Sequence, residues 1–276
     1  MITGPTTFSA ATAFLEALEC KTECIIAGTA PCDSPIYPAE DYTDPLPNCK
    51  MEVRISDEMW NYSIDDDTRI LIEPDLLVPL NFSDYIQGKD PVLEAILNYK
   101  SGYVQLKTSH PDKFIGRYLF GIDKTMEVTN DNGILKAVVK GRLNTILIPD
   151  GKNRFKTCIK GVYIDFKNSN PEIHYTDGQG KVLSRLATTE FSAFDLLLAR
   201  KFDKATEAYT ELKKKYPENI NINGANLAGL AFYYLLETKD FEVAGALLKI
   251  ATKLNPDSRV AKNLAKGVSE MGKIKN

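Results

Sequence analysis

The sequence predicts an α+β protein in which a curved antiparallel sheet with an N-terminal helix precedes an all-α array of helical hairpins. Two observations lead to this prediction. Apolar and polar residues alternate through the middle of the chain, as in a half-buried strand, and apolar residues near the end recur at helical spacing. We expect two domains, residues 1–185 and 186–276. The 43% apolar and 26% charged residues are typical of a globular chain with a buried core.

The charge is distributed unevenly, although the formal net charge is only −3. Residues 1–100 contain 6 basic and 18 acidic side chains, residues 101–185 contain 14 and 8, and residues 186–276 contain 14 and 11. An ordinary solvated surface and an internal electrostatic match both explain this distribution. No stretch approaches the roughly 20 apolar residues of a membrane helix.

The first residues contain neither a basic leader nor a compact apolar run, so we expect a soluble chain without a secretory signal. A chain that has already been processed would look the same. The sequence therefore leaves a cytoplasmic and an organellar location open.

Four of the five cysteines lie within the first 50 residues, with the spacing C-x3-C-x7-C-x16-C, and are Cys20, Cys24, Cys32 and Cys49. This spacing fits a structural zinc site poorly. Reduced thiols, two disulfides and a metal site remain open as alternatives. The fifth cysteine, Cys158, lies in a strand-like run, and we expect it to be a small buried apolar residue.

The first third predicts a helix, a loop and short strands. Residues 6–20 show helical spacing, with an apolar face formed by Phe8, Ala11, Leu15 and Leu18. Residues 30–50 contain five prolines and predict a loop that wraps a surface. Residues 51–55 and 69–73 are strand candidates. The acidic run 65–67 between them is interpreted as a solvated turn.

The middle of the chain predicts one short helix followed by long strands. Residues 90–100 begin with Asp90 as a candidate N-cap and Pro91 at the first helical position. Apolar residues in 134–148 alternate with polar ones and predict one long antiparallel strand, which a turn at 149–153 connects to a returning strand. The alternation of the returning strand slips by one residue at Lys160-Gly161, which predicts a β-bulge.

Six basic residues on the polar side of this expected hairpin predict a basic face: Lys136, Lys140, Arg142, Arg154, Lys156 and Lys160. Such a face suits an acidic partner, the acidic first third of the same chain, or plain solvent. Nucleic acid is not expected as a partner, because the isoelectric point is about 5.6 and no aromatic residues interleave the cations for base stacking.

The run "QGKDPVLEAILNY", the long strands after it and "GVYIDFKNSNPEIHYTDG" resemble the cone-shaped α+β fold of nuclear transport factor 2 and the SnoaL-like polyketide cyclases. The resemblance covers about residues 60–180. It implies that an enzyme of this type would use the cone as a pocket with a general base and hydrogen-bond donors. The candidate residues are Tyr118, Asp123, Tyr163, Asp165 and His174.

These candidates form a weak set. Asp123, Tyr163 and Asp165 oppose the apolar face of their strands, so we expect them to point to solvent. His174 lies beside a turn and is interpreted as a surface histidine. No Ser-His-Asp order, phosphate-binding loop, zinc-protease motif or dinucleotide-binding turn occurs. These residues therefore favour a non-catalytic protein, and we assign them no cofactor and no metal.

A ladder of residue types near the end occurs twice, at a constant offset of 39 residues. The first copy is Phe202, Ala205, Tyr209, Leu212 and Pro217, and the second is Phe241, Ala244, Leu248, Ala251 and Pro256. Residues 187–256 thus resemble a pair of tetratricopeptide repeats, whose usual period is about 34 residues. The extra residues are placed in "ENINI", and residues 257–271 resemble a polar capping helix.

In that family the concave groove binds peptides through Lys, Asn and Arg. The matching positions here are mostly apolar: Glu190, Phe191, Phe194, Leu198, Leu230, Tyr233 and Glu237. An apolar groove requires a cover. We therefore expect a non-catalytic scaffold or subunit of a larger complex that binds a protein partner through Phe191, Phe194, Leu198, Leu230 and Tyr233 and through the basic face. The alternative is a small-molecule-binding protein or an isomerase- or cyclase-type enzyme.

Overall fold

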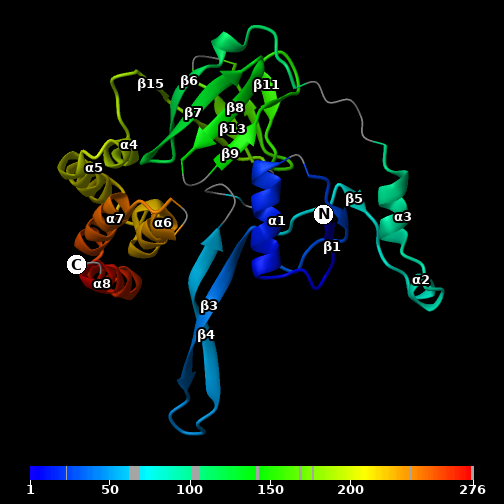
Figure 1. The fold of residues 1–276 in the computed structure, drawn as a ribbon, viewed down its shortest axis with the longest axis horizontal. Helices are drawn as coiled ribbons and strands as arrows, with labels where there is room; N and C mark the ends of the chain where they lie inside the picture. The colour runs from blue at the N-terminus through cyan, green and yellow to red at the C-terminus, as the bar shows by residue number, and fades with distance from the viewer. Residues whose placement is uncertain are drawn as a thin grey trace. The chain divides into compact units, whose positions relative to one another are not determined.

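The computed structural model describes residues 1–274 except 23, 62–66, 68, 101–105, 141–142, 168–169, 176 and 237. The chain forms two compact units (Figure 1). The first unit comprises residues 1–115, 128–138 and 142–182, and the second comprises residues 116–127, 139–141 and 183–276. The predicted mixture of α and β structure and the helical C-terminal region are confirmed. The sequence did not suggest that residues 116–127 belong to the helical unit.

Two five-stranded sheets contain most of the strands. The first has the order β15-β6-β7-β8-β9, with β6 (Gly116–Phe120), β7 (Lys124–Asp131), β8 (Ile134–Val139), β9 (Leu143–Ile146) and β15 (Arg185–Leu186). The second is an antiparallel meander of β10 (Ile148–Pro149), β11 (Arg154–Lys156), β12 (Tyr163–Asp165), β13 (Glu172–His174) and β14 (Gly180–Val182).

Both long strands that the sequence predicted are instead divided into shorter strands. Residues 134–148 divide into β8, β9 and the start of β10. The phase slip at Lys160-Gly161 is a chain reversal and not a bulge, because β11 pairs with β12 in antiparallel register. Gly161 has a φ of 80°, which is open to glycine at little cost. Each strand of a hairpin begins its own alternation, so a reversal changes the phase as a bulge would.

Three phenylalanines form the aromatic centre of the first unit. Phe114, Phe155 and Phe166 pack edge to face, with ring centroids 4.9 to 5.7 Å apart. Their exposed fractions lie between 0 and 7%. Edge-to-face packing places the positive ring edge on the negative ring face, so the alternating apolar residues of the middle strands do fill a core.

Helix α1 (Ala10–Lys21) forms within the predicted range, but its buried face is more polar than predicted. Thr12, Leu15, Glu16, Glu19 and Cys20 are buried, whereas Phe8 is 61% exposed. The two glutamates look like solvent-facing residues in the sequence. The helix therefore exists, but its apolar spacing does not identify the face that it buries.

A buried ion cluster accounts for one of these glutamates. Both oxygens of the Glu19 carboxylate accept hydrogen bonds from the Arg69 guanidinium at 2.7 Å, and Asp67 lies 2.9 Å from the same guanidinium. Only 1% of the Asp67 side chain is exposed, so the interpretation of this residue as part of a solvated turn is wrong. Residues 69–73, a strand candidate, adopt no strand.

Residues 36–45 of the proline-rich segment 30–50 form a strand and not the predicted loop, whereas the rest of the segment forms no strand or helix. β3 (Ile36–Pro45) pairs with β4 (Glu52–Asn61) in a two-stranded antiparallel ribbon (Figure 1). Each strand of such a ribbon has an open edge, where a missing N–H breaks no ladder. The backbone N–H of Leu46 donates to the Met51 carbonyl, so the neighbouring Pro45 faces the open edge of β3 and is tolerated there. Short parallel strands β1 (Ile2–Thr3), β2 (Ala27–Gly28) and β5 (Leu76–Leu77) form a separate sheet.

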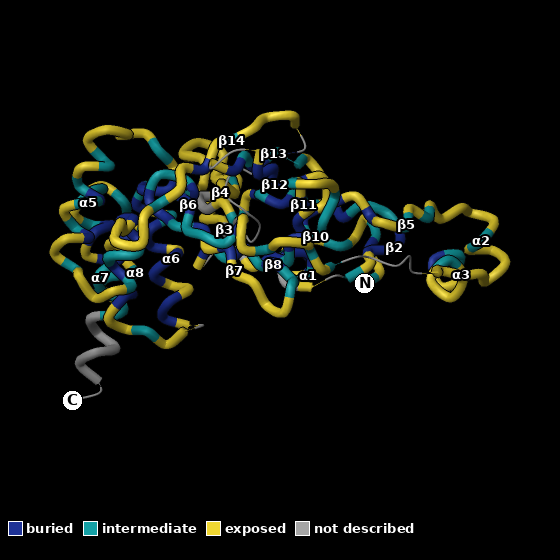
Figure 2. Tube along the Cα trace, turned by 90° about the horizontal axis from the view of Figure 1, so that it is seen from above, coloured by how far each residue is buried: buried dark blue, intermediate teal, exposed yellow. Residues whose placement is uncertain are grey.

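Helices α2 (Phe82–Ile86) and α3 (Pro91–Asn98) follow β5, and most of their residues are exposed (Figure 2). The predicted N-cap of α3 is confirmed, because the Asp90 carboxylate accepts a hydrogen bond from the backbone N–H of Leu93 at 2.9 Å. Val92 is buried, but Leu97 is 75% exposed. The capping signal therefore located α3 correctly, while the leucine and isoleucine side chains of this helix are uncovered.

The second unit contains α4 (Ala193–Leu198), α5 (Phe202–Lys215), α6 (Gly224–Leu236), α7 (Phe241–Leu254) and α8 (Arg259–Ile274). The 14-residue helices α5 and α7 have the same offset of 39 residues as the sequence ladder. Arg200 and Lys239, at the same offset, both adopt positive φ values. The helices that precede α5 and α7 differ in length, since α4 has 6 residues and α6 has 13.

Candidate functional site

The β6–β7 hairpin packs against α4 and α5 through a buried polar cluster. The Tyr209 hydroxyl donates to the Asp123 carboxylate at 2.9 Å, and the Lys124 ammonium lies 3.1 Å from both carboxylate oxygens. The backbone N–H of Phe194 donates to the Asp123 carbonyl at 2.9 Å. Asp123, Lys124 and Tyr209 are at most 1% exposed. These bonds fix the tip of the hairpin against the first pair of helices.

A second polar cluster fixes the segment that leads into α4. The Asp195 carboxylate accepts from Arg117 at 2.6 Å, from the Thr125 hydroxyl at 2.6 Å and from the Ser192 backbone at 3.0 Å. Ser192 in turn accepts from the Asp195 backbone, which completes a capping box. Arg117 also donates to the Glu190 carbonyl at 2.7 Å, so one arginine positions the whole approach to the helix.

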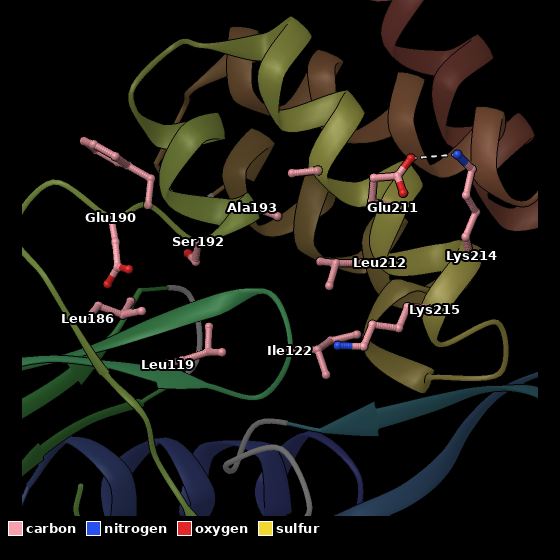
Figure 3. Close-up of a pocket in the computed structure, with 12 residues that line it drawn as sticks. Leu119, Ile122, Leu186, Glu190, Ser192, Ala193, Glu211, Leu212, Lys214 and Lys215 are labelled. Carbon is pink, nitrogen blue, oxygen red and sulfur yellow. Dashed lines mark hydrogen bonds and ion pairs between the residues drawn. The ribbon is translucent and has the colours of Figure 1, made fainter.

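These two clusters lie beside an open groove of about 700 Å³ (Figure 3). Its apolar lining comes from the hairpin, from β15 and from helices α4 and α5. Charged residues lie along its edge. The lining residues are Leu119, Ile122, Leu186, Glu190, Phe191, Ser192, Ala193, Ala208, Glu211, Leu212, Lys214 and Lys215. The groove lies entirely within the second unit.

Phe191 is the most exposed aromatic side chain of this lining, at 45%. The Lys201 ammonium lies 4.4 Å from the centroid of its ring, and the Arg117 guanidinium lies 5.7 Å from it. Cations over an aromatic face stabilise its position. Lys214 forms an ion pair with Glu211 at 2.6 Å. Lys214 and Lys215 belong to the last turn of α5, which therefore brings two lysines to the edge of an apolar surface.

The structure separates the five residues that were predicted to bind a partner. Phe191 and Tyr233 are 45% and 39% exposed, and Leu198 is half-buried. Phe194 and Leu230, at 2% and 5% exposure, fill the helical core and offer no contact surface. Glu237 lies outside the described residues.

The groove also contains residues that the sequence did not suggest as binding residues, among them Leu119 and Leu186. One signal was present in the sequence. Leu119 lies between Tyr118 and Phe120 and therefore points to the opposite face of the strand, where a solvated strand would carry a polar residue. The sequence offered no comparable signal for Leu186.

The weak catalytic candidates serve structural contacts. Asp123 was expected to face solvent, but it is fully buried within the second unit. Tyr118 is 1% exposed, and burial raises the pKa of its hydroxyl. These two belong to the second unit, whereas Tyr163, Asp165 and His174 belong to the first. The five residues are thus not gathered in one unit.

In the first unit, the Tyr163 ring lies between two neighbours. The guanidinium of Arg154, a residue of β11, lies 3.7 Å from the centroid of the Tyr163 ring. The ring of His174, a residue of β13, stacks on the Tyr163 ring with 4.5 Å between the two ring centroids. His174 Nε2 lies 3.3 Å from a Glu172 oxygen. Asp165 forms an ion pair with Lys167 at 3.0 Å and is 8% exposed, so it does not point to solvent as expected.

The expectation of one basic hairpin face is wrong for the five of its six cations that the structure describes, because these lie on different strands and turns. Arg154 and Lys156 both pair with Asp150, at 3.3 and 2.8 Å. Lys136 pairs with Asp131 at 2.8 Å. Lys140 is exposed in the turn after β8, and Arg142 lies outside the described residues. Nearby carboxylates therefore offset much of the positive charge.

None of the five cysteines, all of which the structure describes, forms a disulfide, and the part of the chain that the structure describes holds no cluster of three or more residues suited to a metal ion. Cys158 is half-buried and not fully buried as predicted. Among the described residues, no helix combines the length and the apolar character that crossing a membrane requires. Compared with known proteins, the chain matches no protein-family model, no curated sequence and no solved structure.

Proposed function

We propose that the protein is a non-catalytic interaction or assembly subunit that binds an apolar segment of a protein partner in the groove of the helical unit. The carrying observation is the groove itself, which has an apolar lining and charged residues along its edge. Uncovered apolar surface of this kind marks interaction sites, and an exposed aromatic side chain beside it is a typical energetic anchor.

The duplicated helices support this proposal. Equal bounds of α5 and α7 at an offset of 39 residues are what two copies of one helical hairpin produce. Stacked helical repeats commonly form extended binding surfaces. The resemblance to tetratricopeptide repeats therefore remains part of the proposal, although the short α4 differs from its counterpart α6.

The charges at the edge of the groove define the partner further. Lys213, Lys214 and Lys215 form the last turn of α5, and two of them line the groove. An acidic residue next to the apolar segment of the partner would complement them and speed the encounter. The basic β face is not part of this proposal, because three of its cations, Lys136, Arg154 and Lys156, pair with carboxylates within the first unit.

A pair of equally exposed phenylalanines allows a matched test. Phe191 lines the groove and is 45% exposed, whereas Phe232 on α6 is 46% exposed and does not line it. A photoreactive amino acid at position 191 is expected to cross-link a defined partner from the native source, and the same amino acid at position 232 is not. With the purified partner, Phe191→Ala should weaken binding at least about tenfold, whereas Phe232→Ala should change it less than about twofold.

Equal effects of the two substitutions would contradict the location of the site. Recovery of the protein alone, with a small molecule bound among the sheet strands, would favour the isomerase- or cyclase-type alternative. Circular dichroism of both variants shows whether the helical unit stays folded, so that loss of binding and loss of structure are distinguished.

A further inference from the structure

Two cysteines that are 138 positions apart in the sequence meet inside the first unit. Cys20 lies near the end of α1, and Cys158 lies in the turn between β11 and β12. The Cys158 backbone N–H donates to the hydroxyl of Thr145 on β9, the strand against which α1 packs, and each of the two thiols shifts the pKa of the other. Helix α1 packs against β9 in the same region, so the contact lies at a packed junction of helix and sheet.

The turn that carries Cys158 is held by its own hydrogen bonds. The Thr157 backbone N–H donates to the Val162 carbonyl at 3.0 Å, and the Cys158 backbone N–H donates to the Thr145 hydroxyl at 2.8 Å. Thr145 and Thr157 are 3% and 6% exposed. The position of the Cys158 thiol is therefore fixed from both sides of the turn.

The two thiols differ in acidity and in access. The neighbouring Cys158 thiol, together with burial, raises the pKa of Cys20, whereas the Cys20 thiol lowers the pKa of Cys158. Cys20 is 3% exposed, and Cys158 is half-buried. A thiolate is the reactive form of cysteine, so Cys158 is suited to react first and Cys20 to react second.

We propose that Cys20 and Cys158 form an oxidisable dithiol that a hydroperoxide converts into an intramolecular disulfide. The Cys158 thiolate attacks the peroxide oxygen, the O–O bond breaks, and Cys158 becomes a sulfenic acid while the peroxide is reduced to water or an alcohol. The Cys20 sulfur then attacks the Cys158 sulfur and releases water. Two thiols and one hydroperoxide thus yield one disulfide, one water and one further water or alcohol.

The bond would connect the end of α1 to the β11–β12 turn and close a loop of more than one hundred residues. A cross-link of this length restricts the unfolded chain strongly. Oxidation is therefore expected to raise the melting temperature of the first unit by roughly 5 to 10 °C.

The test uses the full chain with Cys24→Ser, Cys32→Ser and Cys49→Ser, so that only the pair remains. Hydrogen peroxide should lower the intact mass by two hydrogen atoms, and dithiothreitol should reverse the change. Proteolysis without reductant should yield one peptide pair that joins Cys20 to Cys158. The same peptide mapping on the wild-type chain gives a readout that does not depend on the three substitutions.

Single-thiol variants test the order of the two steps. With Cys20→Ser added, dimedone should capture a sulfenic acid at Cys158. With Cys158→Ser added, Cys20 should stay reduced at the same peroxide concentration. An unchanged mass, a disulfide between two molecules, or equal peroxide reactivity of the two single thiols would each overturn the proposal.

Discussion

Removal of the Tyr209 hydroxyl is expected to destabilise the helical unit, because this group donates a buried hydrogen bond to Asp123 at 2.9 Å. A hydrogen bond to a charged acceptor contributes about 1.5–3 kcal/mol to stability. We therefore expect Tyr209→Phe to lower the free energy of unfolding by about 2 kcal/mol. The substitution keeps the buried ring, so packing is preserved.

Asp123→Ala should cost more, about 3–5 kcal/mol, because it removes the carboxylate that faces both Tyr209 and the buried Lys124 ammonium. Adding Lys124→Met to Asp123→Ala should recover part of this loss, since no charge is then left at the site. The effects of the two substitutions should thus not be additive.

Urea unfolding followed by far-ultraviolet circular dichroism measures these differences, since the signal comes chiefly from the helices. Tyr216→Phe is the matched control, because Tyr216 is 37% exposed, and it should stay within about 0.5 kcal/mol of the wild type. If Tyr209→Phe behaved like this control, or if the double variant lost the sum of both single effects, the buried cluster would not hold the hairpin as inferred.

Four further substitutions test other parts of the fold by the same measurement. Gly121→Ala should cost about 1–2 kcal/mol because the φ of Gly121 is 69°, whereas Gly229→Ala, with open space around it in α6, should be neutral or stabilising; equal effects would contradict this. Arg69→Ala should cost about 3–5 kcal/mol, because it leaves two buried carboxylates without their shared cation; a loss below 1 kcal/mol would contradict this. Burial opposes ionisation of Asp240, but hydrogen bonds from Arg200 and the Val243 backbone hold its pKa below 3.8, so its contribution is present above pH 3.8 and is lost as the pH falls further. Asp240→Ala should accordingly cost about 1 kcal/mol near neutral pH and less in acid; a constant difference would contradict this.

The helical part of the fold was readable from the sequence because its signals are local. The duplicated ladder places α5 and α7, and the Asp90-Pro91 pair places the start of α3. A capping side chain bonds within its own turn, and an apolar ladder follows the pitch of one helix. Neither signal depends on what lies elsewhere in the chain.

The strands and the candidate site were less readable because their causes are non-local. Glu19 looks solvent-exposed until Arg69, 50 positions later, is brought to it. Asp123 likewise becomes a core residue only when Tyr209 reaches it from α5. The sequence cannot distinguish a reversal at Gly161 from a bulge, since both shift the alternation by one residue. The groove combines residues from three separate stretches of chain, so its lining follows from tertiary packing and not from any one pattern.

The β3–β4 ribbon has unequal open edges. Pro45 removes a backbone donor from the open edge of β3 that an added strand would need, whereas β4 contains no proline and keeps its full set. A strand from another molecule can therefore extend this ribbon more readily along β4 than along β3. The fold thus resists edge-to-edge polymerisation along β3 and leaves β4 open to strand addition.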